Sequence, residues 1–209
     1  MHPYLTRLNV HPVVQQFLEG CFTMNGQGDL VFPYGDAHEH FGMAFHRVPV
    51  STRFWIAGNY HFSQARQVII ASSAMEAIAW LNNNYSSFSS LDNLLILATG
   101  VKICSEHICF INDMLGGKTF GLLFARDLLG HIADLKIAAG IRKVPVAVYC
   151  REHKIKIVLR SVVYEFATAD FSLAAFEKAS KFRFKIPAYK PSGFDSFFDQ
   201  LKANANLIL

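Results

Sequence analysis

The sequence lacks the features that mark membrane-spanning and exported chains. No apolar run approaches the roughly 18 residues of a membrane span, and no charged segment followed by an apolar stretch suggests a signal peptide. Charged residues are also few, at 17% against 52% hydrophobic residues, which favours a sizeable core over extensive disorder. We therefore expect a folded, cytoplasmic protein that has no membrane partner.

Cysteine is scarce too, and its spacing indicates neither a disulfide framework nor a zinc site. Cys104 and Cys109 flank Glu106 and His107, a weak hint of metal binding for which buried reduced thiols are the alternative. The segment 36–40 could place two imidazoles on one side of a strand, or it could be an exposed polar turn. We expect no metal at either place. The four cysteines are Cys21, Cys104, Cys109 and Cys150.

Acidic residues are outnumbered only toward the end of the chain. The first 60 residues hold three Lys or Arg against four Asp or Glu, whereas residues 142–190 hold eleven against four. The net charge of +4 therefore arises mainly in the last third of the sequence. Partners that carry negative charge are expected to bind there.

Four short apolar runs organise the middle of the chain. Turn residues bound the runs, and helical patterns separate them, so the order predicts an α/β fold with a mostly parallel sheet and right-handed crossovers. Chemistry in such a sheet lies at the carboxyl ends of the strands. The predicted strands are Val68–Ala71, Leu94–Ala98, Thr119–Phe124 and Val144–Cys150.

The two flanks of this sheet have different patterns. Residues 1–60 carry turn signals at short intervals, which predicts a helix near residues 12–19 and then a small antiparallel meander. Residues 61–150 form the predicted sheet domain. Residues 151–209 form a C-terminal extension that packs on it, with extended segments at 155–166 and 184–189 and helices at 173–182 and 194–203.

The segment Gly116-Gly117-Lys118-Thr119 is similar to the end of a phosphate-binding loop. The full pattern needs a glycine where Asn112 stands, and it needs a helix after the threonine, where this sequence predicts a strand. We therefore do not expect this segment to bind a nucleotide.

The strand ends resemble the motifs of a known family. Val68–Ala77, Leu94–Gly100 and Phe124–Gly130 together resemble the core of Toprim domains, in the form found in primase-like proteins of phages and mobile elements. Leu30–Asn59 and Ser192–Asp199 are similar to the segments that flank this core in those proteins. The resemblance covers most of the chain and implies a Toprim-like sheet flanked by helices.

The resemblance also implies a degenerate metal site. In the family, a glutamate at the position of Ser72 acts as general acid and base, and aspartates at the positions of Ala125 and Asp127 hold magnesium. A methyl group cannot bind magnesium, and a serine hydroxyl is a poor general base near neutral pH. We therefore expect no catalysis and no cofactor, and magnesium only if the site is rearranged. The residues of this site are Ser72, Glu76, Gly100, Ala125, Asp127 and Gly130; Ser72 and Asp127 could instead be helix caps.

Basic residues in the last third suggest a partner. Lys154 and Lys156 alternate along one extended run, as do Arg183 and Lys185 along another, and aromatic residues lie between them. This combination is typical of single-stranded DNA or RNA binding. The leading hypothesis is thus a non-catalytic, nucleic-acid-associated protein derived from a primase-like ancestor. Two alternatives are an active primase or nuclease with a rearranged site, and a protein-interaction scaffold that binds no nucleic acid.

Overall fold

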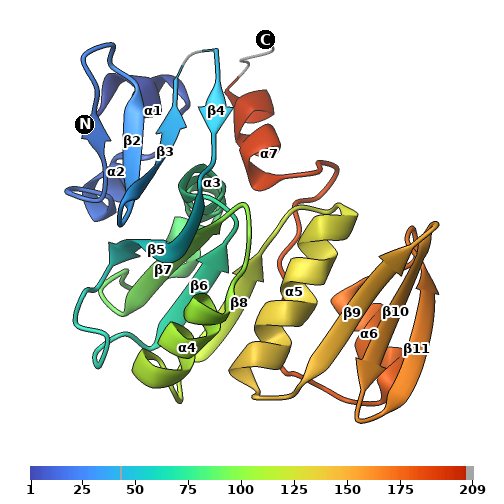
Figure 1. Cartoon of the computed structure of the whole chain (residues 1–209). Helices are drawn as coiled ribbons and strands as arrows, with labels where there is room; N and C mark the ends of the chain where they lie inside the picture. The colour runs from blue at the N-terminus through green and yellow to red at the C-terminus, as the bar shows by residue number, and fades with distance from the viewer. Residues whose placement is uncertain (43, 206–209) are drawn as a thin grey trace.

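The structure is a computed structural model that describes residues 1–42 and 44–205. In this part of the chain the strands form three sheets, with the orders β1-β2-β3-β4, β5-β7-β6-β8 and β11-β10-β9 (Figure 1). The chain is therefore an α/β protein, as its sequence predicts, but its sheets are mostly antiparallel or mixed. None of the helices described is both long enough and apolar enough to cross a membrane.

The central sheet contains three of the four predicted strands. Strand β6 (Gln67–Ala71) pairs in parallel with β7 (Leu94–Gly100) on one side and with β8 (Thr119–Leu123) on the other. Strand β5 (Val50–Gly58) pairs with β7 in the antiparallel direction, which makes the sheet mixed. The parallel strands are buried along almost their whole length, which explains why they read as continuous apolar runs.

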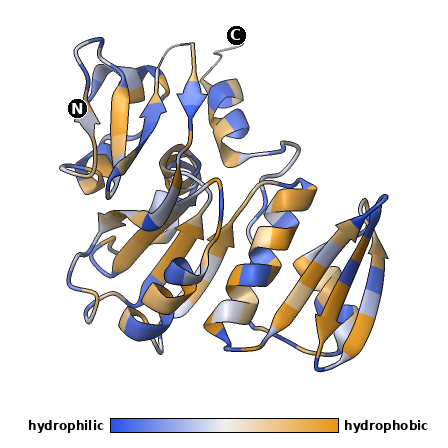
Figure 2. Ribbon diagram, in the orientation of Figure 1, coloured by the Kyte–Doolittle hydropathy of each residue, from blue (hydrophilic) through white to orange (hydrophobic). Residues whose placement is uncertain are grey.

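Helices cover both faces of this sheet, and each face has its own core. Ile69 and Ala71 of β6 pack with α3 (Ala74–Asn84), whereas Val68 and Ile70 pack on the opposite face. That second core also contains residues of α4 (Ser105–Met114) and α5 (Leu128–Ile141). Figure 2 shows the apolar colour of the central strands between these helices.

The prediction for Val144–Cys150 is wrong, because this segment does not join the central sheet. It forms β9 (Val146–Arg151), which pairs antiparallel with β10 (Lys154–Leu159), and β10 pairs with β11 (Val162–Ala167). Two-residue turns connect these strands, and all four turn residues have positive φ: Glu152, His153, Arg160 and Ser161. Such left-handed turns match the twist of paired strands, so local hairpin pairing prevails over a crossover.

A different segment occupies the place beside β8. The Leu122 amide donates to the Pro187 carbonyl at 2.9 Å, and the Tyr189 amide donates to the Leu122 carbonyl at 2.8 Å. Leu122 and Ala188 thereby form a parallel bridge. The segment 187–189 therefore covers this edge of the central sheet.

The first and last elements described lie on one side of the central sheet. Residues 23–42 and 44–47 form the predicted antiparallel meander, whereas residues 50–58, expected in the same N-terminal segment, form β5 of the central sheet. The last helix, α7 (Phe197–Asn204), packs against α3 and beside β4 (Figure 1). Helix α6 (Leu173–Ser180) packs on the β9–β11 sheet. The N-terminal elements are α1 (Pro3–Arg7), α2 (Pro12–Phe17), β1 (Thr23–Met24), β2 (Leu30–Tyr34), β3 (Ala37–Phe41) and β4 (His46–Arg47).

Candidate functional site: the two ends of the central strands

A cavity of about 320 Å³ opens at the carboxyl ends of β6, β7 and β8. Parallel strands end at one edge of a sheet, so residues that follow them in the sequence come together there. Other lining groups come from β4 and from the start of α7, including His46 and Ser196. All six residues of the predicted degenerate site line this cavity: Ser72, Glu76, Gly100, Ala125, Asp127 and Gly130.

The two serines that follow β6 have different roles. Ser73 is the N-cap of α3, and its hydroxyl accepts the Glu76 amide at 3.1 Å. Ser72 is partly exposed in the cavity, and its amide donates to the Leu123 carbonyl at 3.2 Å. The cap is thus Ser73, and the Ser72 hydroxyl remains a cavity group.

The Glu76 carboxylate binds the start of another helix. The side chain is 5% exposed, and its two oxygens accept the amides of Phe197 at 2.6 Å and Phe198 at 3.2 Å, the first residues of α7. Burial raises the pKa of Glu76, while the two amide donors oppose this shift because they favour the charged form. The sequence does not reveal this contact, since 121 residues separate Glu76 from Phe197.

Asp127 caps the helix that it precedes. Its Oδ1 accepts the Gly130 amide at 2.7 Å at the start of α5. A methyl group at Gly130 would collide with the carbonyl of Ala125, so glycine is required for the close approach of this turn to the end of β8. The order Asp-x-x-Gly is therefore explained by helix capping and packing.

A third carboxylate, that of Glu39 on β3, also binds the start of a helix. It is fully buried and accepts the Ala74 amide at 2.8 Å and the Met75 amide at 3.2 Å, at the start of α3. The Tyr34 hydroxyl donates to Glu39 at 2.6 Å, and His46 Nε2 lies 2.8 Å from its other oxygen. Burial, together with the adjacent carboxylate, holds the pKa of Tyr34 well above its ordinary value.

These three acids, which we call the capping carboxylates (Glu39, Glu76 and Asp127), neutralise the amino-terminal ends of α3, α7 and α5. Magnesium needs oxygen ligands that are free to turn toward it. In residues 1–42 and 44–205, no three His, Cys, Asp or Glu side chains are arranged to hold a metal ion. The remaining cavity groups are mainly hydroxyls and apolar side chains.

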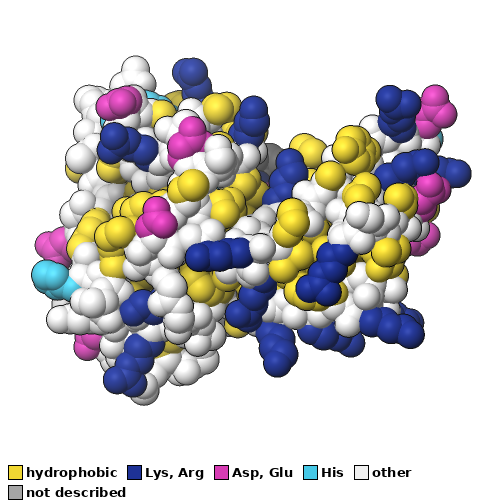
Figure 3. Space-filling model, turned by 60° about the horizontal axis from the view of Figure 1, so that its bottom comes forward, with side chains coloured by type: hydrophobic (Ala, Val, Ile, Leu, Met, Phe, Trp, Pro, Cys, Tyr) yellow, Lys and Arg dark blue, Asp and Glu magenta, His cyan; other side chains and the backbone are white. Residues whose placement is uncertain are grey.

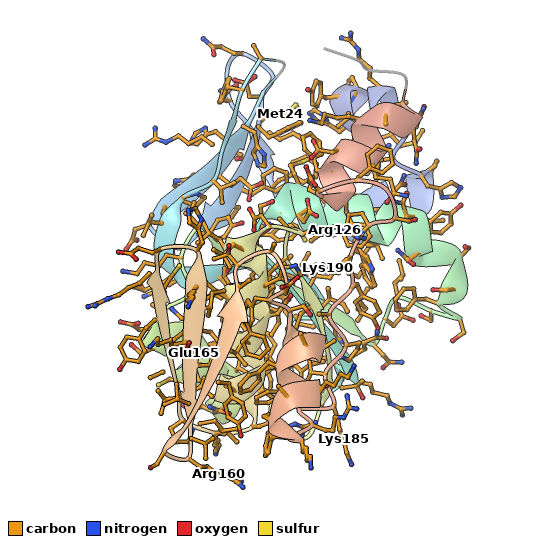
Figure 4. The ribbon with its side chains drawn as sticks, turned by 90° about the vertical axis from the view of Figure 1, so that its right-hand side faces the viewer. Met24, Arg126, Arg160, Glu165, Lys185 and Lys190 are labelled. Atoms are coloured by element: carbon orange, nitrogen blue, oxygen red, sulfur yellow. The ribbon has the colours of Figure 1, made fainter. Side chains whose placement is uncertain are left out.

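A buried ion pair lies behind the cavity. Lys190 Nζ is 2.6 Å from Asp134 Oδ2 of α5, and it donates to the carbonyls of Phe124 at 2.9 Å and Ala125 at 3.0 Å. Figure 4 shows Lys190 inside the molecule, near Arg126. Burial raises the pKa of Asp134 to about 6, although the Lys190 ammonium opposes this shift. Lys190 thus links the segment 187–189 to the end of β8.

The four basic residues predicted to bind nucleic acid lie on separate surfaces. Lys154 and Lys156 are exposed on β10, whereas Ile155 and Ile157 on the opposite face of β10 pack in the core with α6. Arg183 and Lys185 flank the buried Phe184, which belongs to that core. Lys156 also pairs with Glu165 at 2.8 Å, and Arg183 pairs with Glu177 at 3.3 Å.

A different set of cations lies together, at the amino ends of the parallel strands. Arg66 and Lys118 precede β6 and β8, whose first residues, Gln67 and Thr119, are direct neighbours. They line a polar hollow of about 590 Å³. Lys118 Nζ donates to the Ser63 carbonyl at 3.0 Å, which holds the ammonium at its rim.

Two further cations extend this set along the edge. Lys185 precedes the segment that pairs with β8, three residues before the bridge between Leu122 and Ala188. Arg142, just after α5, donates from Nε to the Phe184 carbonyl at 2.6 Å, beside Lys185. We call Arg66, Lys118, Arg142 and Lys185 the basic row. Figure 3 shows the face at this end of the molecule, where Lys and Arg lie across the lower middle without Asp or Glu between them.

The fold and these two sites define an α/β protein with a mixed central sheet. A cavity lies at the carboxyl ends of its parallel strands, where carboxylates cap the adjoining helices, and a basic row lies at their amino ends. The chain matches no family model, no curated protein and no solved structure at a significant level.

Proposed function

We propose that the protein is a non-catalytic nucleic-acid-binding module with a Toprim-like core, and that the basic row carries the binding. The observation that supports this most is the row itself, in which cations from segments far apart in the sequence lie at the amino ends of the strands and beside them. Neighbouring strands are about 4.8 Å apart, so Arg66 and Lys118, which precede β6 and β8, lie at a spacing that a flexible phosphate backbone can match. Lys185 lies three residues before the bridge to β8. Arg142 continues the row beyond the sheet.

The absence of catalysis in this proposal rests on the capping carboxylates. A metal-dependent primase or nuclease would need at least two carboxylates free to bind the ion. Glu76 is held by two backbone amides and Asp127 by one, and Ala125 offers only a methyl group. An active enzyme with a rearranged site would have to break these caps, so it is the alternative that the geometry supports least.

A protein-interaction scaffold is the second candidate, and one observation favours it. Val101 and Leu129, beside the mouth of the cavity, are 68% and 74% exposed. Apolar side chains exposed next to a cavity are typical of surfaces that bind other proteins. A binding titration separates this candidate from the first.

The test is a fluorescence-anisotropy titration of the full chain against labelled single-stranded DNA and RNA. We expect weak binding to both at low ionic strength, because phosphate contacts do not depend on base sequence. If all four cations contact phosphates, the slope of log affinity against log salt should be about −3. No association with either nucleic acid at low salt would reject the proposal and place the scaffold first.

A further inference from the structure

Strand β11 forms an open margin of the third sheet. All six of its residues pair with β10, from Lys154 opposite Ala167 to Leu159 opposite Val162. No strand in the described part of the chain pairs with its other side. In Figure 1, β11 lies at the far right of the molecule, away from the other two sheets.

The other sheet margins are short, irregular or covered. Strand β5 contains a register shift between Val50 and Trp55 and packs against β2 and α4. The segment 187–189 covers the free side of β8, β9 lies against α5, and β1 and β4 have two residues each. Proteins protect their sheet edges in these ways because an unprotected edge pairs with other strands. By this criterion, β11 is the margin left open among the described residues.

The sequence of β11 also lacks the residues that prevent edge pairing. Val162–Ala167 contains no Pro, Gly, Lys or Arg, and Val162 and Val163 are 51% and 54% exposed. Its one charge, on Glu165, faces Lys156 of the neighbouring strand at 2.8 Å. Aromatic and β-branched residues of this kind favour strand pairing. The edge is thus regular, apolar and nearly neutral.

We propose that β11 pairs in the antiparallel direction with β11 of a second copy of this chain, around a two-fold axis at Tyr164. Residues opposite each other in an antiparallel pair point to the same face, so the axis must pass through a residue position. An axis at Tyr164 or at Glu165 gives the longest overlap. The axis at Glu165, however, would place Glu165 opposite Glu165 of the second copy, and like charges in these positions cost free energy. The axis at Tyr164 places Val163 opposite Glu165 of the second copy.

This pairing joins two three-stranded sheets into one sheet of six strands. A second copy suits the edge better than an unrelated strand, because the same register satisfies both chains at once. An interface made mainly by one strand pair is smaller than a stable dimer needs, so the dimer should be weak, with a dissociation constant on the order of 10–100 µM.

The test is sedimentation velocity on the full chain from about 1 to about 500 µM, a concentration range that brackets the expected dissociation constant. The variant Val163→Glu would place like charges opposite each other twice, and we expect it to weaken the dimer at least tenfold. The matched variant Val163→Lys would face Glu165 of the second copy, and we expect it to keep or strengthen the dimer. Both substitutions are at an exposed position, and far-UV circular dichroism checks that the fold is kept.

Three outcomes would overturn the proposal. A wild-type chain that stays monomeric throughout would leave this edge to an extended segment of another protein. A dimer that neither variant changes would have its interface elsewhere. Equal weakening by both variants would contradict the register, and with it the two-fold pairing at Tyr164.

Discussion

The two ends of the central parallel strands treat charge in opposite ways. At the carboxyl ends, the capping carboxylates point inward and bind backbone amides, so little of their charge is offered to a ligand. At the amino ends, Arg66 and Lys185 of the basic row are exposed, whereas Lys118 and Arg142 each donate to a backbone carbonyl at the surface. The same sheet thus uses acids for internal structure at one edge and bases at the surface of the other. A partner attracted by charge should therefore bind at the amino ends, away from the position that the family resemblance emphasises.

Removing the capping carboxylates one at a time tests whether they serve the internal structure of the protein. If they act as structural caps, their importance should follow their burial. Glu39→Ala leaves a tyrosine hydroxyl and two helix amides without an acceptor in the core, so we expect a loss of about 3–4 kcal/mol of unfolding free energy. Glu76→Ala should cost about 2 kcal/mol, and the more exposed Asp127→Ala about 1 kcal/mol.

Urea denaturation of the three variants measures this order. Asp127→Asn is a matched control, because asparagine caps a helix about as well as aspartate and should leave stability nearly unchanged. If Glu39→Ala cost less than Asp127→Ala, burial would not determine the role of these acids.

The ion pair between Asp134 and Lys190 connects the two ends of the central strands. Lys190 lies at the carboxyl end of β8, and it holds the segment that carries Lys185 at the amino ends. Asp134 has a pKa of about 6 in the folded protein, raised above the value of about 4 expected in the unfolded chain. Between these values the folded state binds more protons than the unfolded state, so the contribution of Asp134 to stability falls as pH rises and is constant above about 6.

We therefore expect Asp134→Asn, which cannot titrate, to gain about 2 kcal/mol relative to wild type when the pH is raised from about 4 to about 6.5. Denaturation at several pH values, compared between the two proteins, gives this difference. The opposite sign, with the wild type gaining as pH rises, would mean that Lys190 lowers the pKa of Asp134 more than burial raises it.

Metal binding tests whether the carboxylates of the cavity are free to bind a ligand. The wild-type cavity should bind magnesium or manganese more weakly than about 1 mM, because its carboxylates are engaged as caps. The double variant Ser72→Glu, Ala125→Asp restores the two acids that the family resemblance implies, and we expect its manganese affinity to rise measurably. Titration followed by electron paramagnetic resonance detects both. Tight binding by the wild type would revive the enzyme hypothesis.

The smallest predicted effect concerns the turns of the third sheet. His153 and Ser161 have φ of 66° and 67°, a region that residues other than glycine and asparagine rarely adopt. His153→Gly and Ser161→Gly should each stabilise the protein by about 0.5 kcal/mol, as measured by thermal unfolding, because the greater entropy of glycine in the unfolded chain offsets part of the strain that is relieved. A loss of stability at either position would indicate that the side chain makes a contact more important than the backbone strain.

These turns also show where prediction from the sequence ends. Strands β6, β7 and β8 were predictable, because their apolar runs are long enough to be buried and helical patterns separate them. Ser72, Gly100, Ala125 and Asp127 were predictable for the same reason, since parallel strands end on the same side of a sheet. Glu76 and Gly130 were placed in the site only by the family resemblance. The sheet of β9 was not, because Glu152-His153 and Arg160-Ser161 contain neither Gly nor Asn, the usual signal of a two-residue hairpin turn.

The site was predictable only in its position. Glu39 caps a helix that begins 35 residues later, and Arg142 bonds a carbonyl 42 residues away. Contacts at these separations depend on the packed fold and leave no local pattern in the sequence. The expected alternation of Arg183 and Lys185 failed for a related reason: Lys185 has a φ of 56°, so its backbone is not extended.

The central claim is that the basic row, and no other group of cations, binds nucleic acid. Two variants of equal charge test it directly: Arg66→Gln, Lys118→Ala, Lys185→Ala in the row, and Lys154→Ala, Lys156→Ala, Arg183→Ala on strand β10 and beside helix α6. We expect anisotropy titrations at low salt to show that the row variant loses at least tenfold in affinity and about two units of salt slope, while the control variant stays within about twofold of wild type. Equal losses of affinity in the two variants would mean that net charge alone determines binding. A larger loss of affinity in the control variant would mean that the basic row is not the binding surface.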